Sequence, residues 1–196
     1  MLDPHQEKVL ILDFGSQYTQ LIARRVRELK VYCEIHPYIM SLADIQEFAP
    51  RAIILSGGPR SVYDRDAPSV DPDLFALGVP VLGICYGIQL LNHLLGGEVA
   101  PAVSREYGHK TFTITNFDDL FYGLNAQEQV WMSHGDRVDH LAPGFEVIGY
   151  SDSCPTGAIR DTSRRLYGVQ FHPEVNTSRR PASNVSPEMS TMPSIT

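Results

Sequence analysis

The fold is decided by residues 79–95, which read VPVLGICYGIQLLNHLL. The first six residues, 79–84, form a short apolar run of the kind that makes a buried strand. From residue 88 onward, apolar residues recur with helical spacing on one broad stripe, namely Ile88, Leu90, Leu91, Leu94 and Leu95. Between these parts, glycines on both sides of Cys85 predict a tight turn. We therefore expect a strand that runs directly into a helix, with Cys85 at the turn.

This strand–turn–helix pattern is typical of a nucleophile elbow, with Cys85 at the position where hydrolases carry serine. Gly83 and Gly87 allow the backbone to turn sharply, which leaves the sulfur exposed at the end of the sheet. A helix N-terminus beside the sulfur favours the thiolate, which is the reactive form of cysteine. The alternative for a single cysteine after an apolar strand is an inert position in the core.

A second motif supplies a base for Cys85. Residues 167–171 read as a strand, and His172-Pro173-Glu174 follows it. In an extended chain, side chains two residues apart point to the same side, and Pro173 disfavours helix around it. The pattern predicts that Glu174 orients His172, which takes the thiol proton. One alternative is that His172 is an ordinary surface histidine. Metal binding by His172 and Glu174 is a second alternative, but no third ligand follows at a suitable spacing. Two motifs at two strand ends favour catalysis.

Composition places the chain among globular proteins. It has 196 residues, of which 43% are apolar and 20% charged, which suits one domain. A net charge of −7 argues against a nucleic-acid partner, which would need clustered positive charge. The basic cluster 24–27 is the exception, and we expect it on the solvated face of a helix. No basic leader and no apolar run of membrane-spanning length occur, and the three scattered cysteines form no disulfide framework, so we expect no membrane partner and a cytoplasmic protein.

Strands alternate with helices in the first half of the chain. Strands are predicted at 9–12, 31–35, 52–55 and 79–84, and helices near 21–29 and 74–77. This alternation indicates an α/β fold with a parallel sheet covered on both faces. From residue 99 the chain is rich in strands, which we interpret as antiparallel additions near 112–114, 130–132, 147–150 and 158–159. Residues 177–196 are rich in Ser, Thr and Pro without helical period, and we expect a disordered or aberrant tail after a domain at 8–176.

Several motifs together resemble the class I glutamine amidotransferases. Within this family, the pattern is most similar to the amidotransferase domains of bacterial GMP synthases, chiefly through residues 12–20 and 24–29. The other matching stretches are 55–59, 83–89, 131–136 and 168–174. The resemblance covers roughly residues 8–176 and implies a flavodoxin-like fold, mainly a parallel sheet flanked by helices with added antiparallel strands.

The resemblance also implies the chemistry and its residues. Members hydrolyse glutamine through a cysteine thioester, without a metal or cofactor in this domain. The implied catalytic residues are Cys85, His172 and Glu174. Backbone N–H groups of Gly58 and Tyr86 would form the oxyanion site, and the elbow independently favours Tyr86. The implied substrate contacts are Gln89, Ser133, Gly135 and Asp136; Gln89 also lies one helical turn past Cys85, although a surface polar residue is the alternative. We expect Ser133–Asp136 to form a polar loop.

Partners follow from the same resemblance. In GMP synthases the ammonia passes to an ATP pyrophosphatase (synthetase) domain, which uses ATP and Mg²⁺ to aminate XMP to GMP. We expect that this chain lacks that domain and also the helix that follows the His-Pro-Glu motif in relatives. Two alternatives remain: a glutaminase component for another acceptor, such as chorismate, and a catalytically idle regulatory module. The N-terminal motif argues against the first, and the intact Cys85, His172 and Glu174 argue against the second.

Overall fold

The computed structural model describes residues 7–175, apart from the side chains of residues 103–105. The predicted tail at 177–196 and the predicted loss of a terminal helix therefore lie outside the described residues. The elements, in chain order, are β1 (Lys8–Asp13), α1 (Thr19–Glu28), β2 (Tyr32–Pro37), α2 (Leu42–Phe48), β3 (Ala52–Leu55), the 3-10 helix η1 (Pro72–Ala76), β4 (Val81–Ile84), α3 (Tyr86–Leu94), β5 (Glu98–Ile114), β6 (Gln127–His140), β7 (Glu146–Ser151), β8 (Cys154–Asp161) and β9 (Leu166–Val169).

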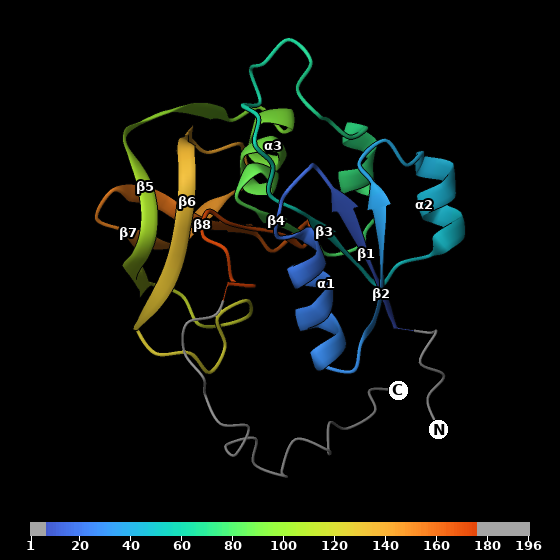
Figure 1. Ribbon diagram of the computed structural model, residues 1–196, viewed down its shortest axis with the longest axis horizontal. Coiled ribbons are helices and arrows are strands. Elements are labelled where there is room, and N and C mark those ends of the chain that lie inside the picture. The colour runs from blue at the N-terminus through green and yellow to red at the C-terminus, as the bar shows by residue number, and fades with distance from the viewer. Residues whose placement is uncertain (1–6, 176–196) are drawn as a thin grey trace.

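One nine-stranded sheet organises the molecule, in the order β2-β1-β3-β4-β9-β8-β7-β5-β6. Strands β2, β1, β3, β4 and β9 are parallel, whereas the remaining pairs are antiparallel. The predicted α/β fold with added antiparallel strands is confirmed. Figure 1 shows the parallel part with α1 and α2 on one side of the molecule and the long strands β5 and β6 on the other. The order β2-β1-β3-β4 is the flavodoxin-like order, in which ligands bind at the carboxyl ends of the strands.

Two hydrophobic cores lie on opposite faces of the parallel strands. Leu10 and Leu12 of β1 pack into a cluster with residues of α2, η1 and α3. Ile11, between them in sequence, packs into the other cluster with Ile22 of α1. Successive side chains of a strand point to opposite faces, so an unbroken apolar strand buries both of its faces under helices.

Glycines 83 and 87 allow α3 to lie directly against the sheet. A Cβ atom added at Gly87 would lie 2.4 Å from the backbone oxygen of Leu55, and one added at Gly83 would lie 2.5 Å from Gly87. These separations are too short for any side chain. The glycines predicted from the elbow motif are therefore required by close backbone packing of α3 on β3 and β4.

Some local predictions differ from the structure. Helix α2 was not predicted, although Ser41 accepts a hydrogen bond from the N–H of Asp44 at 3.2 Å and so forms an ordinary N-cap. Strands β5 and β6 are much longer than expected, with 17 and 14 residues. The polar loop expected at 133–136 lies inside β6, and β9 ends at Val169, two residues earlier than predicted.

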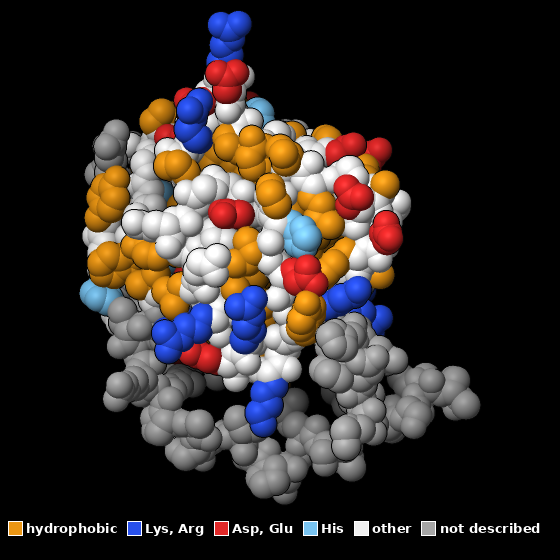
Figure 2. All heavy atoms as spheres, turned by 45° about the vertical axis from the view of Figure 1, so that its right-hand side comes forward, with side chains coloured by type: hydrophobic (Ala, Val, Ile, Leu, Met, Phe, Trp, Pro, Cys, Tyr) orange, Lys and Arg blue, Asp and Glu red, His pale blue; other side chains and the backbone are white. Residues whose placement is uncertain are grey.

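Both basic and acidic side chains are present on the face of the molecule drawn in Figure 2. On this face, several basic side chains lie along the lower part and several acidic ones at the upper right, with hydrophobic side chains between them. Among residues 7–175, none of the helices combines the length and the apolar composition needed to cross a bilayer.

Candidate active site

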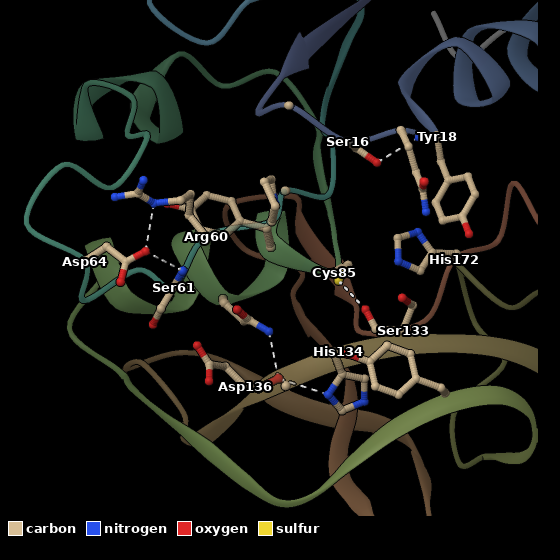
Figure 3. A pocket seen from close by; sticks show the side chains of 18 residues that line it. Ser16, Tyr18, Arg60, Ser61, Asp64, Cys85, Ser133, His134, Asp136 and His172 are labelled. Atoms are coloured by element: carbon tan, nitrogen blue, oxygen red, sulfur yellow. Dashed lines mark hydrogen bonds and ion pairs between the residues drawn. The ribbon is translucent and has the colours of Figure 1, made fainter.

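The motifs that follow four strands of the sheet meet at one cavity. The segments after the carboxyl ends of β1, β3, β4 and β9 carry Ser16, Gly58, Cys85 and His172, and all four residues line a cavity of about 700 Å³. Figure 3 shows Cys85, His172 and Ser133 converging on the same side of this cavity. The parallel sheet explains the convergence, because the carboxyl ends of its strands meet at one edge.

Cys85 occupies the predicted elbow. It is the N-cap of α3, with φ 53° and ψ −103°, a conformation that is strained for a residue other than glycine. Its N–H donates to the carbonyl of Val169 at 2.9 Å, which ties the turn to β9. Its thiol donates to the carbonyl of Ser133 at 3.5 Å. The sulfur thus lies between β9, β6 and the start of a helix, where Cys85 is 6% exposed, adjoins the second hydrophobic cluster and lines the cavity.

His172 and Glu174 meet as predicted, but through different backbone geometry. The chain turns at Pro173 and Glu174, with the N–H of Val175 donating to the carbonyl of His172 at 3.2 Å, so the extended conformation predicted here was wrong. Within the turn, Nδ1 of His172 lies 2.8 Å from Oε1 of Glu174. Nε of Arg25 donates to the carbonyl of Glu174 at 3.1 Å. The basic cluster on α1, predicted as a solvated face, therefore also anchors this turn.

The surroundings of His172 favour its charged form. Burial by itself favours the neutral ring, but hydrogen bonds and charge from Cys85 and Glu174 outweigh burial and raise the pKa of His172 to about 10. Glu174 is itself buried, and its Oε2 has no hydrogen-bond partner within the described part of the chain. An imidazolium beside the sulfur stabilises the negative charge that forms there once the thiol has lost its proton. The three groups therefore have the order of a nucleophile, a proton carrier and an orienting carboxylate.

Stability should depend on pH through His172. A pKa raised on folding from about 6.5 to about 10 contributes stability that is fully present below pH 6.5 and is lost as pH rises towards 10. We expect chemical denaturation to show this fall in the free energy of unfolding for the wild type and a flatter profile for His172→Gln. His36→Gln, which changes a partly exposed ring on β2, is the control. An identical pH profile in His172→Gln and wild type would contradict the expectation.

Backbone groups suited to an oxyanion line the same cavity as Cys85. Tyr86 is the first residue of α3, and N–H groups in a first helical turn have no acceptor within their own helix. A Cβ added at Gly58 would lie 2.9 Å from the backbone oxygen of Phe14, so this position requires bare backbone. Both residues line the cavity together with Cys85. Their role as oxyanion donors remains a prediction that this placement supports.

The four predicted substrate contacts also line the cavity. Gln89 is only 3% exposed, so it is not a surface polar residue. Its Nε2 donates to the carbonyl of Asp136 at 2.8 Å and to Oε1 of Gln170 at 3.2 Å. Gln89 thus links α3 to β6, the strand that carries Ser133, Gly135 and Asp136. Direct contact of these residues with substrate remains a prediction.

Sequence reasoning missed several residues of the cavity. Tyr18 packs edge-on against the ring of His172, with centroids 5.1 Å apart. The preceding loop is fixed by Asp13, whose Oδ1 accepts from the N–H of Gly15 and the hydroxyl of Thr19 at 2.9 and 2.7 Å. Gln170, which accepts a hydrogen bond from Gln89 but does not line the cavity, was also missed. The signal was present, because both stretches supported the family resemblance without being given a chemical role.

The three cysteines should differ sharply in reactivity. Burial raises the pKa of Cys33, and burial together with Glu106 raises that of Cys154 to about 12. Only Cys85 among the three lines the cavity. We expect a glutamine-like electrophile to modify Cys85 first, as measured by peptide mass spectrometry, with pre-incubated glutamine as the protecting control. Equal labelling of all three thiols in folded protein would contradict this assignment.

An α/β fold with a cysteine at a strand–helix elbow and a histidine–carboxylate pair at the same cavity has the arrangement that a cysteine nucleophile requires. A model of the glutamine amidotransferase class-I family matches residues 10–188. The chain therefore belongs to the class-I glutamine amidotransferase family.

Two relatives to which the chain is similar carry the same name, GMP synthase. The chain is 54% identical over 172 residues to the GMP synthase [glutamine-hydrolyzing] of Enterococcus faecalis, covering 88% of this chain and 33% of that protein. It is 56% identical over 175 residues to the Heliobacterium modesticaldum protein of the same name, covering 89% and 34%. The chain thus spans about a third of the length of these relatives.

Solved structures share the fold. A candidate GMP synthase subunit from Thermoplasma acidophilum matches with a TM-score of 0.74 and 26% identity, covering 86% of this chain and 85% of that one. A glutamine amidotransferase from Thermotoga maritima matches with a TM-score of 0.67 and 22% identity, covering 86% and 76%. The second likeness bears on the fold alone.

Proposed function

We propose that this chain is the glutaminase part of a GMP synthase, and that it hydrolyses glutamine to glutamate and ammonia. The observation that carries the proposal is the convergence of Cys85 and His172 on one cavity of about 700 Å³, with Nδ1 of His172 held 2.8 Å from Oε1 of Glu174. A thiolate can attack the carbon of an amide, and an imidazolium beside it can protonate the nitrogen that leaves.

The reaction follows from these positions. The Cys85 thiolate attacks the carboxamide carbon, and N–H groups of Gly58 and Tyr86 stabilise the oxyanion. His172 then protonates the nitrogen, which departs as ammonia and leaves a thioester. His172 next removes a proton from water, and the resulting hydroxide attacks the thioester. Glutamate is released and the thiolate–imidazolium pair is restored. Losing one oxyanion donor would cost about 3 kcal/mol of transition-state stabilisation.

The acceptor is proposed from the relatives. Identities of 54–56% to GMP synthases favour XMP as the acceptor of the ammonia, on an ATP pyrophosphatase domain or subunit that uses ATP and Mg²⁺. This domain would itself use no metal or cofactor. Its three thiols are buried and unpaired, which suits a reducing cytoplasm. Residues 8–176 form the proposed amidotransferase domain.

An assay of this chain with a synthetase partner tests the proposal. We expect weak glutaminase activity from the chain alone, and a rise when an ATP pyrophosphatase domain is added with XMP and ATP. Chorismate with its own synthase component is the matched comparison. Stimulation by the chorismate system alone would replace the proposed acceptor, and no glutamate formation under any condition would contradict the glutaminase itself.

A further inference from the structure

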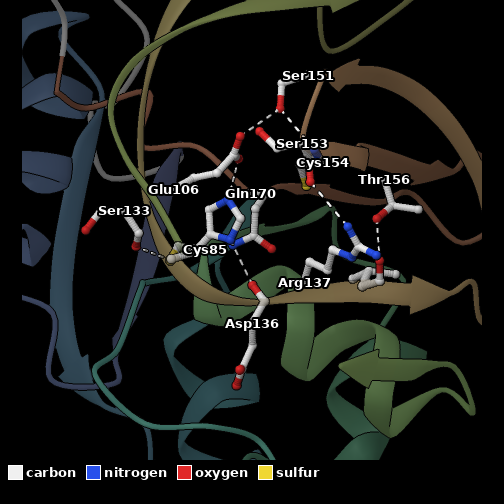
Figure 4. Close-up of polar contacts among 12 residues, drawn as sticks. Cys85, Glu106, Ser133, Asp136, Arg137, Ser151, Ser153, Cys154, Thr156 and Gln170 are labelled. Atoms are coloured by element: carbon white, nitrogen blue, oxygen red, sulfur yellow. Dashed lines mark hydrogen bonds and ion pairs between the residues drawn. The ribbon is translucent and has the colours of Figure 1, made fainter. Parts of the chain in front are cut away.

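A second buried imidazole–carboxyl pair lies at the wall of the cavity, which His134 helps to line. Nε2 of His134 on β6 is 2.9 Å from Oε2 of Glu106 on β5, and their side chains are 1% and 2% exposed. Figure 4 shows Glu106 next to Ser151, whose hydroxyl donates to Oε1 of Glu106 at 3.5 Å. The proposed reaction uses neither side chain. A histidine–glutamate pair buried this deeply, whether ionised or neutral, is stable only where hydrogen bonds satisfy the polar atoms of both side chains.

The contacts of His134 exclude it as a second base. Its Nδ1 lies 3.0 Å from the carbonyl oxygen of Asp136, and a carbonyl only accepts, so Nδ1 carries a proton. Nε2 faces a carboxyl group, so a further proton lies between Nε2 and Glu106. Both ring nitrogens are therefore committed. His172 differs, because only Nδ1 is committed to Glu174, which leaves the other nitrogen for Cys85.

The pair lies at an irregularity between β5 and β6. Glu106 is paired in register with His134, and Pro101 with Asp136. Residues 102–105 therefore stand opposite the single residue Gly135, which has no register partner in β5. Such bulges release backbone groups from the ladder and redirect them. Glu106 is the first paired residue after the bulge, and the ring of His134 reaches the carbonyl of Asp136 at its other end.

The segment held in this way forms one wall of the cavity. The carbonyl of Ser133 accepts from the thiol of Cys85, and the carbonyl of Asp136 accepts from Nε2 of Gln89 as well as from His134. Gly135, between them, lines the cavity too. We propose that Glu106 and His134 are positioning residues that keep the backbone of residues 133–136 open to the cavity and thereby set the affinity for glutamine. The inference rests on the proposed glutaminase function.

Kinetics of Glu106 variants test this role. Glu106→Ala leaves a ring nitrogen of His134 buried without a partner, so the wall should shift and KM for glutamine should rise by roughly tenfold or more. The value of kcat should change little, because Cys85 and His172 stay in place. Glu106→Gln can donate to Nε2 of a neutral ring and should restore KM to within about threefold of wild type. Glu34→Ala, which removes the carboxylate paired with His36 on β2, is the matched control.

A merely structural role would lower stability and the amount of active enzyme without separating KM from kcat. Unchanged KM in Glu106→Ala, or an equal loss in Glu106→Gln, would overturn the inference while glutamine hydrolysis by the wild type still stood. If the wild type hydrolyses no glutamine, the proposed function fails and hydrogen exchange decides the positioning role. Faster hydrogen exchange of amides 133–137 in Glu106→Ala, but not in Glu106→Gln or Glu34→Ala, supports the positioning role. Exchange in Glu106→Ala equal to that of the wild type overturns this role.

Discussion

Cys85→Ala should abolish glutamine hydrolysis while the fold is retained. Removing the nucleophile of a comparable triad lowers kcat by about 10⁶-fold, so residual activity should lie below detection in an ordinary glutamate assay. The fold should persist because the thiol is small and its hydrogen bond to Ser133 is long, 3.5 Å, and alanine preserves the Cβ that the turn already accommodates.

Two controls separate loss of chemistry from loss of structure. Cys33→Ala removes a buried thiol on β2, away from the cavity, and should keep activity. Circular dichroism and a thermal melt of Cys85→Ala should match the wild type. Activity of Cys85→Ala near the wild-type rate would remove the nucleophile from the assignment.

His172 and Glu174 should differ in severity, and this is the second large effect. His172 moves protons in both halves of the reaction, whereas Glu174 orients and stabilises the ring through the 2.8 Å contact. We expect His172→Ala to approach the loss seen for Cys85→Ala. Glu174→Ala should retain more activity, by about tenfold or more, because orienting groups of triads contribute less than the groups that react. Single-turnover rates of glutamate formation measure both.

The assignment of His172 as the proton carrier and Glu174 as the orienting group depends on the order of these activity losses. Glu174→Gln keeps the shape and the acceptor oxygen but loses the charge, so it should fall between wild type and Glu174→Ala. A larger loss from Glu174 variants than from His172→Ala would reverse the proposed roles, because it would make the carboxylate the group that handles the proton.

The local parts of the fold could be predicted from sequence because neighbouring residues determine them. The run into Cys85 combines an apolar strand, two glycines and an apolar stripe, and each signal supports the same turn. Helix α2 was not predicted because it has only seven residues and buries one of them, Ile45, which is too short for a helical period to emerge. The lengths of β5 and β6 depend on their pairing with each other, which composition does not reveal.

The site was predictable where one motif holds its own members together. Cys85 with Tyr86, and His172 with Glu174, lie within one or two residues of each other. Contacts between distant segments were not predictable, such as the thiol of Cys85 with Ser133, 48 residues away. The error at 133–136 has the same origin, because Gly135 and Asp136 disfavour strands, and only the bulge opposite them in β5 explains how a strand accommodates them.

Trapping the thioester tests the central claim most directly. The chain would be mixed with glutamine, quenched in acid within one turnover, digested and examined by mass spectrometry, with ammonia measured in parallel. We predict an adduct with the mass of glutamine less ammonia on the peptide that contains Cys85, matched by one ammonia per adduct and absent from Cys85→Ala. Release of ammonia and glutamate at an undiminished rate by Cys85→Ala, with no adduct on Cys85 in the wild type, would contradict the account.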